Sequence, residues 1–191
     1  MTMPDPSISS PAPDLPPSGA RRRWLVGGVA AVAAAAGAGF AAWRFRLGEP
    51  SDEAAAALWQ LKFDTPTGGS LAMQSLKGRP LLVNFWATWC PPCVEELPLL
   101  DAFFRENAPN GWQVIGLAVD QPSAVRTFLG RTPVSFPVGM AGLGGTELAK
   151  SLGNLAGGLP FSVVFGADGS VRHRRMGRVN ADDLRQWAAI A

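Results

Sequence analysis

Two cysteines three positions apart are the residues of this chain best suited to chemistry. Cys90 and Cys93 are the only cysteines among 191 residues, and Pro91 and Pro92 lie between them. The apolar run at residues 81–86 predicts a buried strand just before them. A helix that opens directly after a strand points free N–H groups and the positive end of its dipole at the first cysteine, which favours the thiolate. We therefore expect Cys90 to be a nucleophile.

The spacing of the two cysteines also suits a disulfide. Proline at the first helical positions loses no hydrogen bond, and two intervening residues bring the second sulfur within bridging distance of the first. Cys93 is thus the predicted resolving thiol. The predicted chemistry is a dithiol–disulfide couple between Cys90 and Cys93.

Two alternatives to a redox pair are weaker. A closed zinc site needs four ligands, but the chain offers no third cysteine and a single histidine, His173. A purely structural disulfide across so short a loop would remove little entropy from the unfolded chain. The order strand, Cys-x-x-Cys, helix is the context that a redox motif requires. The sequence predicts no metal and no cofactor.

The charge distribution argues against a nucleic-acid partner. The chain has 17 basic and 15 acidic residues, a net charge of +2. Five arginines and three acidic residues fall within residues 1–50, which leaves twelve of each sign in the remainder. The small excess of positive charge therefore belongs to the amino-terminal segment, and the rest carries no basic footprint.

The amino-terminal segment has the composition of a leader and a membrane anchor. Residues 1–20 contain six prolines and are predicted to be disordered. Three arginines then open the 21–46 segment, and residues 24–43 run without a charge, with tryptophan at both ends. That length and those flanks predict a transmembrane helix. Residues 47–57 read as a linker with a helical end.

The orientation of this anchor follows from charge and chemistry. Three arginines precede the span and two follow it, which mildly favours a cytoplasmic amino terminus. A working thiol couple beyond such an anchor is best suited to the periplasm. We therefore expect a bacterial inner-membrane protein with a periplasmic domain. The alternative is a twin-arginine export signal at Arg21-Arg22-Arg23, cleaved near Ala36-Gly37-Ala38 to release a soluble periplasmic protein.

Residues 58–191 are predicted to form one α/β domain. Hydrophobic periodicity and turn residues predict helices at 73–77 (a single turn), 122–131, 146–152 and 181–190, together with the active-site helix, which opens at the two prolines and ends before Pro109. They predict strands at 58–63, 69–71, 81–86, 112–119, 136–138, 161–165 and 170–174. Asn180 is the expected cap of the last helix. Strands alternating with helices, then a hairpin and a closing helix, predict a mixed central sheet flanked by helices.

The residues around the cysteines resemble a known family. Residues 84–93, Asn-Phe-Trp-Ala-Thr-Trp-Cys-Pro-Pro-Cys, followed by Glu96 and Pro98, are similar to the active-site segment of thioredoxin-fold proteins. More narrowly, they resemble the membrane-anchored, TlpA-like (ResA-like) thiol-disulfide oxidoreductases. The resemblance covers about residues 58–191. It implies a thioredoxin fold with an added amino-terminal hairpin and a central strand-helix insert.

The resemblance also singles out residues that would tune the couple. Cytoplasmic thioredoxins carry a buried aspartate at the position of Asn84, where it serves as a proton acceptor. With an amide there, proton transfer for Cys93 needs another base, and Glu96 lies one helical turn beyond Cys93 on the same face. TlpA-like relatives commonly carry a glutamate at this place. Glu95 is expected to be an ordinary acidic residue of the first helical turn.

A second loop completes the site that the resemblance implies. Gly158-Leu159-Pro160 is similar to the cis-proline loop that lies against the disulfide in this fold. Pro160 is thus an expected catalytic-site residue with a cis Leu159–Pro160 bond. The expected substrate contacts are Trp89, Pro91, Pro92 and Leu159, whereas Trp86 is expected to pack in the core.

The implied activity is exchange with protein thiols and disulfides. TlpA-like relatives act mainly as reductants, for example of apocytochrome c or copper-site precursor thiols, with a membrane thiol transporter as the electron donor. Two other functions stay open from the sequence. One is an oxidant that introduces disulfides, and the other is a non-enzymatic copper or thiol chaperone.

Overall fold

The computed structural model describes Gly37 and residues 52–189. The elements follow in the order α2 (Asp52–Leu58), β1 (Lys62–Asp64), β2 (Ser70–Ala72), the 3₁₀ turn η1 (Met73–Leu76), β3 (Leu81–Trp86), α3 (Pro91–Asn107), the 3₁₀ turn η2 (Ala108–Asn110), β4 (Gln113–Ala118), α4 (Pro122–Leu129), β5 (Val138–Met140), α5 (Gly144–Ser151), β6 (Phe161–Phe165), β7 (Val171–Met176) and α6 (Ala181–Ala188). The resulting α/β architecture is the one the sequence predicts.

The predicted leader and anchor fall outside this description. Residues 1–20, the 21–46 segment apart from Gly37, and the linker before residue 52 are not among the described residues. Within the described residues, no helix combines the length and the apolar character that crossing a membrane requires. The helical end predicted for the linker is confirmed by α2.

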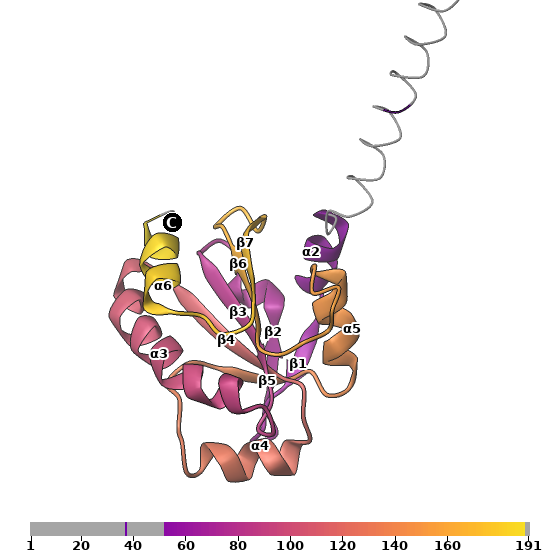
Figure 1. The fold of residues 1–191 in the computed structure, drawn as a ribbon, viewed down its shortest axis with the longest axis vertical. Helices are drawn as coiled ribbons and strands as arrows, with labels where there is room; N and C mark the ends of the chain where they lie inside the picture. The colour runs from indigo at the N-terminus through magenta and orange to yellow at the C-terminus, as the bar shows by residue number, and fades with distance from the viewer. Residues whose placement is uncertain (1–36, 38–51, 190–191) are drawn as a thin grey trace, which may run out of the picture. The chain divides into compact units, whose positions relative to one another are not determined.

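The strands form one mixed sheet in the order β2-β1-β5-β4-β3-β6-β7 (Figure 1). β3, β4 and β5 are parallel, while β6 runs antiparallel to β3 and β1 antiparallel to β5. The register places Trp86, Ala118 and Met140 in one row at the end of these parallel strands. Phe161 lies opposite Phe85, next to that row. We call this boundary, where β3, β4 and β5 finish, the carboxyl end of the sheet.

Two apolar layers cover the sheet, because side chains alternate between the faces of each strand. On one face, α3 and α6 pack on Leu82, Val114 and Val164. On the other face, α2 and α5 pack on the neighbouring residues Val83 and Ile115. Figure 1 shows the two helix pairs on opposite sides of the sheet. Every residue of β3 and β4 is consequently buried.

Both expected additions to a minimal thioredoxin fold are present. β1 and β2 form the amino-terminal antiparallel hairpin. β5 and α5 form the central strand-helix unit, and β5 joins the hairpin to the parallel strands because it pairs with both β1 and β4. The predicted thioredoxin fold is confirmed.

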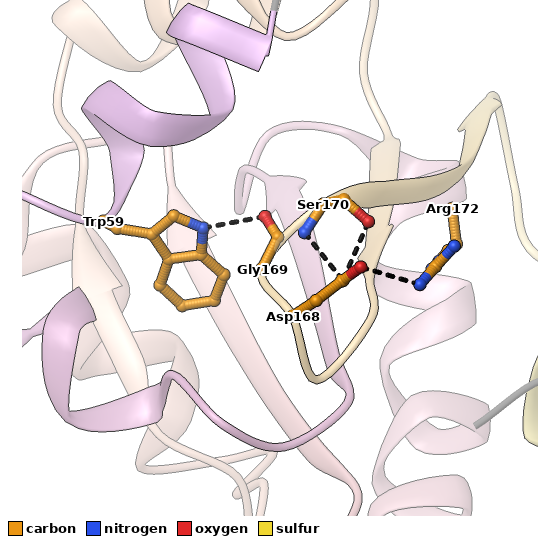
Figure 2. Close-up of polar contacts among 5 residues, drawn as sticks. All are labelled: Trp59, Asp168, Gly169, Ser170 and Arg172. Atoms are coloured by element: carbon orange, nitrogen blue, oxygen red, sulfur yellow. Dashed lines mark hydrogen bonds and ion pairs between the residues drawn. The ribbon is translucent and has the colours of Figure 1, made fainter.

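A hydrogen bond joins the start of the domain to its last hairpin. The indole N–H of Trp59, just after α2, donates to the Gly169 carbonyl in the β6–β7 turn at 3.0 Å (Figure 2). Asp168 fixes the same turn by accepting from the amide and hydroxyl of Ser170 and from Arg172. Gly169 has a φ of 82°, a conformation that favours glycine.

Two predicted strands are wrong in their limits. The strand expected from Leu58 begins only at Lys62, since α2 continues through Leu58 and both Leu58 and Trp59 are buried, which breaks the alternation of a strand. The strand expected at 136–138 instead spans Val138–Met140. Its ladder with β4 starts at Val138, because the preceding residue is a proline without an N–H.

Of the other predicted elements, two strands match in full and the rest differ by a few residues at their ends. The strands at 81–86 and 161–165 are confirmed as predicted. The helix predicted at 122–131 ends at Leu129, and the strand predicted at 170–174 continues to Met176. Asn180 caps α6 as expected, since its side chain accepts from the Asp183 amide while Asp183 accepts from the Asn180 amide.

Candidate active site

The two cysteines lie at the junction between β3 and α3, at the carboxyl end of the sheet. Cys90 is the residue before the first helical turn, with φ −106° and ψ 98°, and Pro91 and Pro92 begin the helix with exposed side chains. The amides of Cys93 and Val94 both donate to the Cys90 carbonyl, at 3.0 and 3.1 Å. The positive end of α3 is therefore directed at Cys90.

The sulfurs of Cys90 and Cys93 form a disulfide with an S–S distance of 2.08 Å and a Cα–Cα distance of 5.3 Å. The two cysteines differ in accessibility. Cys90 retains 5% of its surface, whereas Cys93 is completely buried. An incoming thiol or thiolate thus meets Cys90 first.

The loop before Cys90 is anchored by a residue that the sequence did not indicate. Asp120, just after β4, accepts hydrogen bonds from the Thr88 amide at 2.9 Å and the Thr88 hydroxyl at 2.6 Å. Partial burial acts to raise the pKa of Asp120, but these bonds and one from the Gln121 amide outweigh it and hold the pKa below 3.8. Trp89, the next residue along the loop, is 66% exposed.

Glu96 lies on the face of α3 that covers the sheet, and it is buried, with 1% of its surface exposed. It follows Cys93 by three residues, so their side chains are neighbours on one face of α3. Its carboxylate accepts from the Asn84 side-chain amide at 2.7 Å and from the Val179 backbone amide at 2.7 Å. Burial raises the pKa of Glu96 from 4.5 to about 7, although these two bonds and the charge of Arg178 oppose the rise.

Sheet register explains how Asn84 and Ser162 come to lie below Glu96. The two residues are partners in the antiparallel pair β3–β6. They share a face with Leu82 and Val164, which is the face that α3 covers. The Asn84 amide nitrogen donates to the Ser162 hydroxyl at 3.0 Å as well as to Glu96. Asn84, Ser162 and Glu96 therefore form one buried polar cluster.

Glu95 is separated from this cluster. It is exposed, and its carboxylate pairs with the Arg178 guanidinium in the loop before α6. The next residue, Val179, supplies the amide that binds Glu96. The structure thus distinguishes the two neighbouring glutamates as the sequence predicts, with Glu96 facing the interior and Glu95 facing solvent.

The Leu159–Pro160 bond is cis, as expected. Pro160 is buried and comes directly before Phe161, which pairs with Phe85 of β3. This register places the Pro160 loop beside the carboxyl end of β3. The loop that carries Cys90 begins at that same end. The Pro160 carbonyl accepts from the Gly177 amide at 2.9 Å, which joins the loop to the segment that carries Val179.

The remaining predicted site residues lie around this centre. Leu159 is half-buried between the two apolar layers, and Trp86 is buried in the core as expected. His173 lies on the edge strand β7 as predicted, but it is half-buried, with its ring stacked on Trp187 at 6.3 Å. Across the described residues, no three histidine, cysteine or acidic side chains come together to hold a metal ion.

Fold and site define a thiol-disulfide oxidoreductase, and comparison with known proteins agrees. Residues 54–188 match the Redoxin family, so the chain belongs to that family. It is 30% identical over 121 residues to thiol-disulfide oxidoreductase ResA of Bacillus anthracis, covering 63% of this chain and 68% of that protein. It is 34% identical over 126 residues to thiol:disulfide interchange protein DsbE of Vibrio cholerae, covering 65% and 63%.

A solved structure supports the same assignment. The crystal structure of a thioredoxin-family thiol:disulfide interchange protein from Chlorobium tepidum superposes with a TM-score of 0.60 at 31% identity, covering 69% of this chain and 92% of that one. The TlpA-like (ResA-like) resemblance seen in the sequence is thereby confirmed.

Proposed function

We propose that this protein is a periplasmic reductant of protein disulfides. The observation that carries the proposal is the placement of the Cys90–Cys93 pair at the start of α3, with Cys90 outermost and the buried Glu96 carboxyl one turn further along the helix. This arrangement provides an accessible nucleophile, a resolving thiol and a proton acceptor in one helical segment.

The proposed reaction starts from the reduced dithiol. The Cys90 thiolate attacks one sulfur of a partner disulfide, and the other partner sulfur leaves as a thiolate. Cys93 then loses its proton and attacks Cys90, which breaks the mixed disulfide and releases the second partner sulfur. The enzyme loses two electrons and ends as the Cys90–Cys93 disulfide. The partner gains two electrons as two thiolates, which take up their protons from the solvent.

Glu96 is the proposed acceptor of the Cys93 proton. Its pKa of about 7 leaves it partly ionised at neutral pH, so it can both take and return a proton. The bonds from Asn84 and Val179 hold the carboxylate in place on the Cys93 face. Asn84 thus supports the base rather than acting as one.

The proposed partner contacts surround Cys90. Pro91, Pro92 and Trp89 are exposed next to it. Leu159 and Pro160 belong to the loop beside it. An extended partner segment that carries the target cysteine can lie along this loop.

The proposed location follows from the amino-terminal sequence, and the proposed electron donor from the resemblance to TlpA-like proteins. Residues 24–43 would anchor the protein in the bacterial inner membrane, and a membrane thiol transporter would return electrons to the disulfide. Reduction of cytochrome c or copper-site precursors is the proposed use. The second candidate is an oxidant, because the same sulfur chemistry runs in either direction according to the potential of the couple.

The midpoint potential of the Cys90–Cys93 couple separates these two directions. For a reductant we expect a value near or below about −200 mV, on the thioredoxin side of the known range. Equilibration of the full-length chain with defined ratios of reduced and oxidised dithiothreitol, followed by quantification of free thiols, measures it. A midpoint near about −120 mV, typical of a strong disulfide donor, would assign the oxidant function instead.

A further inference from the structure

The short connection between β7 and α6 is bonded to two separate parts of the site. The Gly177 amide donates to the Pro160 carbonyl at 2.9 Å. Two residues later, the Val179 amide donates to the Glu96 carboxylate at 2.7 Å. The chain then enters the cap of α6. We call residues 177–179 the crossing segment, because it joins the Pro160 loop to the proposed proton acceptor.

Gly177 has a backbone conformation that this connection requires. Its φ is 77°, in the left-handed region that favours glycine. Met176, the residue before it, is still paired with Phe161 in the sheet, so the chain leaves β7 at Gly177. Adjoining residues apart, a Cβ at Gly177 would meet no atom of the described residues within 4 Å. A larger residue there is therefore disfavoured by its backbone conformation and not by crowding.

The turn at Gly177 brings the Val179 amide to Glu96. Val179 is itself fixed in place, since only 1% of its surface is exposed and it packs in the apolar layer with residues of α3 and α6. Burial has the largest effect on the pKa of Glu96 and raises it. The bond from the Val179 amide has the next largest effect and lowers it, because a donated hydrogen bond favours the charged carboxylate. This amide therefore helps to keep Glu96 ionisable at neutral pH.

Among the described residues, few charged groups are directed at Glu96. Beneath it, β3 and β6 supply the uncharged side chains of Asn84 and Ser162. The crossing segment supplies Arg178, whose charge acts to lower the pKa of Glu96 and which is paired with Glu95. The acidic residues in the first turn of α6 are bound elsewhere, namely Asp182 to Arg185 and Asp183 to the Asn180 amide. Burial and the two hydrogen bonds that Glu96 accepts therefore have the largest effects on its charge.

We propose that Gly177 is a positioning residue for thiol exchange, because its left-handed conformation directs the Val179 amide onto Glu96. Gly177 acts through this amide and not on the sulfurs themselves. With the amide in place, the Glu96 carboxyl can accept the Cys93 proton at neutral pH. The inference rests on the proposed function, since it assumes that Glu96 takes this proton when Cys93 attacks Cys90.

The reaction of the reduced full-length chain with dithiobis(nitrobenzoate) separates the two chemical steps. The Cys90 thiolate attacks one sulfur of this aromatic disulfide, forms a mixed disulfide and releases the first coloured thiolate. Cys93 then gives its proton to Glu96 and attacks the Cys90 sulfur, which forms the Cys90–Cys93 disulfide and releases the second thiolate. The chain loses two electrons, and the reagent gains them as two thiolates. The second phase of stopped-flow absorbance therefore measures the resolving step.

Gly177→Val should slow the second phase about fivefold at pH 7 and raise the pH at which its rate levels off by about one unit. The first phase should stay unchanged, because Glu96 takes no part in it. Gly177→Asn should restore the second phase to within about twofold of the wild type, since asparagine tolerates a positive φ.

Gly68→Val is the matched control for backbone conformation. Gly68 lies in the turn between β1 and β2, its φ is 93°, and a Cβ there would likewise meet no atom of the described part of the chain within 4 Å. This variant should lose stability as Gly177→Val does and leave both phases at their wild-type rates. Gly177→Ala carries the same test with a smaller side chain if Gly177→Val does not fold.

A double-mutant cycle separates positioning from general destabilisation. In the Glu96→Gln background, Gly177→Ala should have no further effect on the second phase, because the proton acceptor is already absent. A wild-type pH profile in both Gly177→Ala and Gly177→Val would overturn the proposal. Equal slowing by Gly68→Val, or a Gly177→Asn variant as slow as Gly177→Val, would overturn it too. A wild type that releases one thiolate and no second would instead reject the proposed function.

Discussion

Replacement of Cys90 by alanine is expected to abolish reduction of protein disulfides, with a loss of at least about 1000-fold in the rate constant. The reason is that Cys90 is the accessible sulfur at the start of α3, whereas Cys93 is completely buried behind it. No third cysteine exists to take its place. The measurement is the turnover of a disulfide-containing protein substrate by the full-length chain, with the electrons supplied by dithiothreitol.

Cys93→Ala is the matched control for this variant, because it removes the resolving thiol and keeps the nucleophile. It should react once and then remain linked to the substrate as a mixed disulfide through Cys90, visible as a mass increase that reduction reverses. If instead Cys90→Ala forms the stable mixed disulfide and Cys93→Ala forms none, the assigned roles are reversed.

Substitution of Glu96 by glutamine is expected to slow thiol exchange at neutral pH by about 100-fold. Glutamine keeps the size of the side chain but cannot accept the Cys93 proton. The pH profile should change as well. In the wild type, the rate of resolution should rise with pH and level off above about 7, where the Glu96 carboxyl is ionised. In the variant it should keep rising toward the ordinary thiol pKa of about 8.5.

The same variant should change how stability depends on pH. The folded-state pKa of Glu96 lies above its ordinary value of 4.5, so the folded protein holds a proton that the unfolded chain releases. This contribution to the free energy of unfolding is present below about pH 4.5 and is lost as the pH rises through about 7. It amounts to roughly 3 kcal/mol. Glu96→Gln should remove that slope in denaturant unfolding of the oxidised protein.

Glu95→Gln is the control for both measurements. Glu95 has the same chemistry one residue earlier in α3, but it is exposed and paired with Arg178. We expect its exchange rates and stability profile between pH 5 and 9 to follow those of the wild type. Identical profiles for wild type, Glu95→Gln and Glu96→Gln would show that Glu96 is only a buried structural acid.

The sequence predicted the centre of the site because its parts are local. The Cys-x-x-Cys spacing, the strand before it and the glutamate one turn after Cys93 all lie within one strand-helix unit. Pro160 came from resemblance to a family rather than from periodicity, since a proline before a strand is by itself ordinary.

The residues that the sequence missed depend on contacts between distant segments. Ser162 faces Glu96 only because β6 pairs with β3 in a register that opposes Ser162 and Asn84. Val179 contributes a backbone amide, for which no side-chain signal exists. Asp120 was not indicated by the sequence, and its bonds to Thr88 place it beside the loop that leads to Cys90. The only available hint was that it directly follows a buried strand.

The predicted limits of two strands were wrong for physical reasons of the same kind. An apolar run beginning at Leu58 suited a strand, but tertiary packing of α2 buries Leu58 and Trp59 together as the end of a helix. The apolar Phe136 suggested a strand, yet its ring packs against Phe104 in the core, and pairing with β4 starts two residues later. In both cases burial, rather than alternation, decided the local structure.

The most direct test of the account is the identity of the thiol that reacts first in the reduced protein. A brief exposure of the reduced full-length chain to iodoacetamide at pH 7, followed by peptide mass mapping, measures this. Because Cys90 lies at the helix start and retains accessible surface, we expect it to be labelled at least about tenfold faster than Cys93. Preferential labelling of Cys93 would contradict the account.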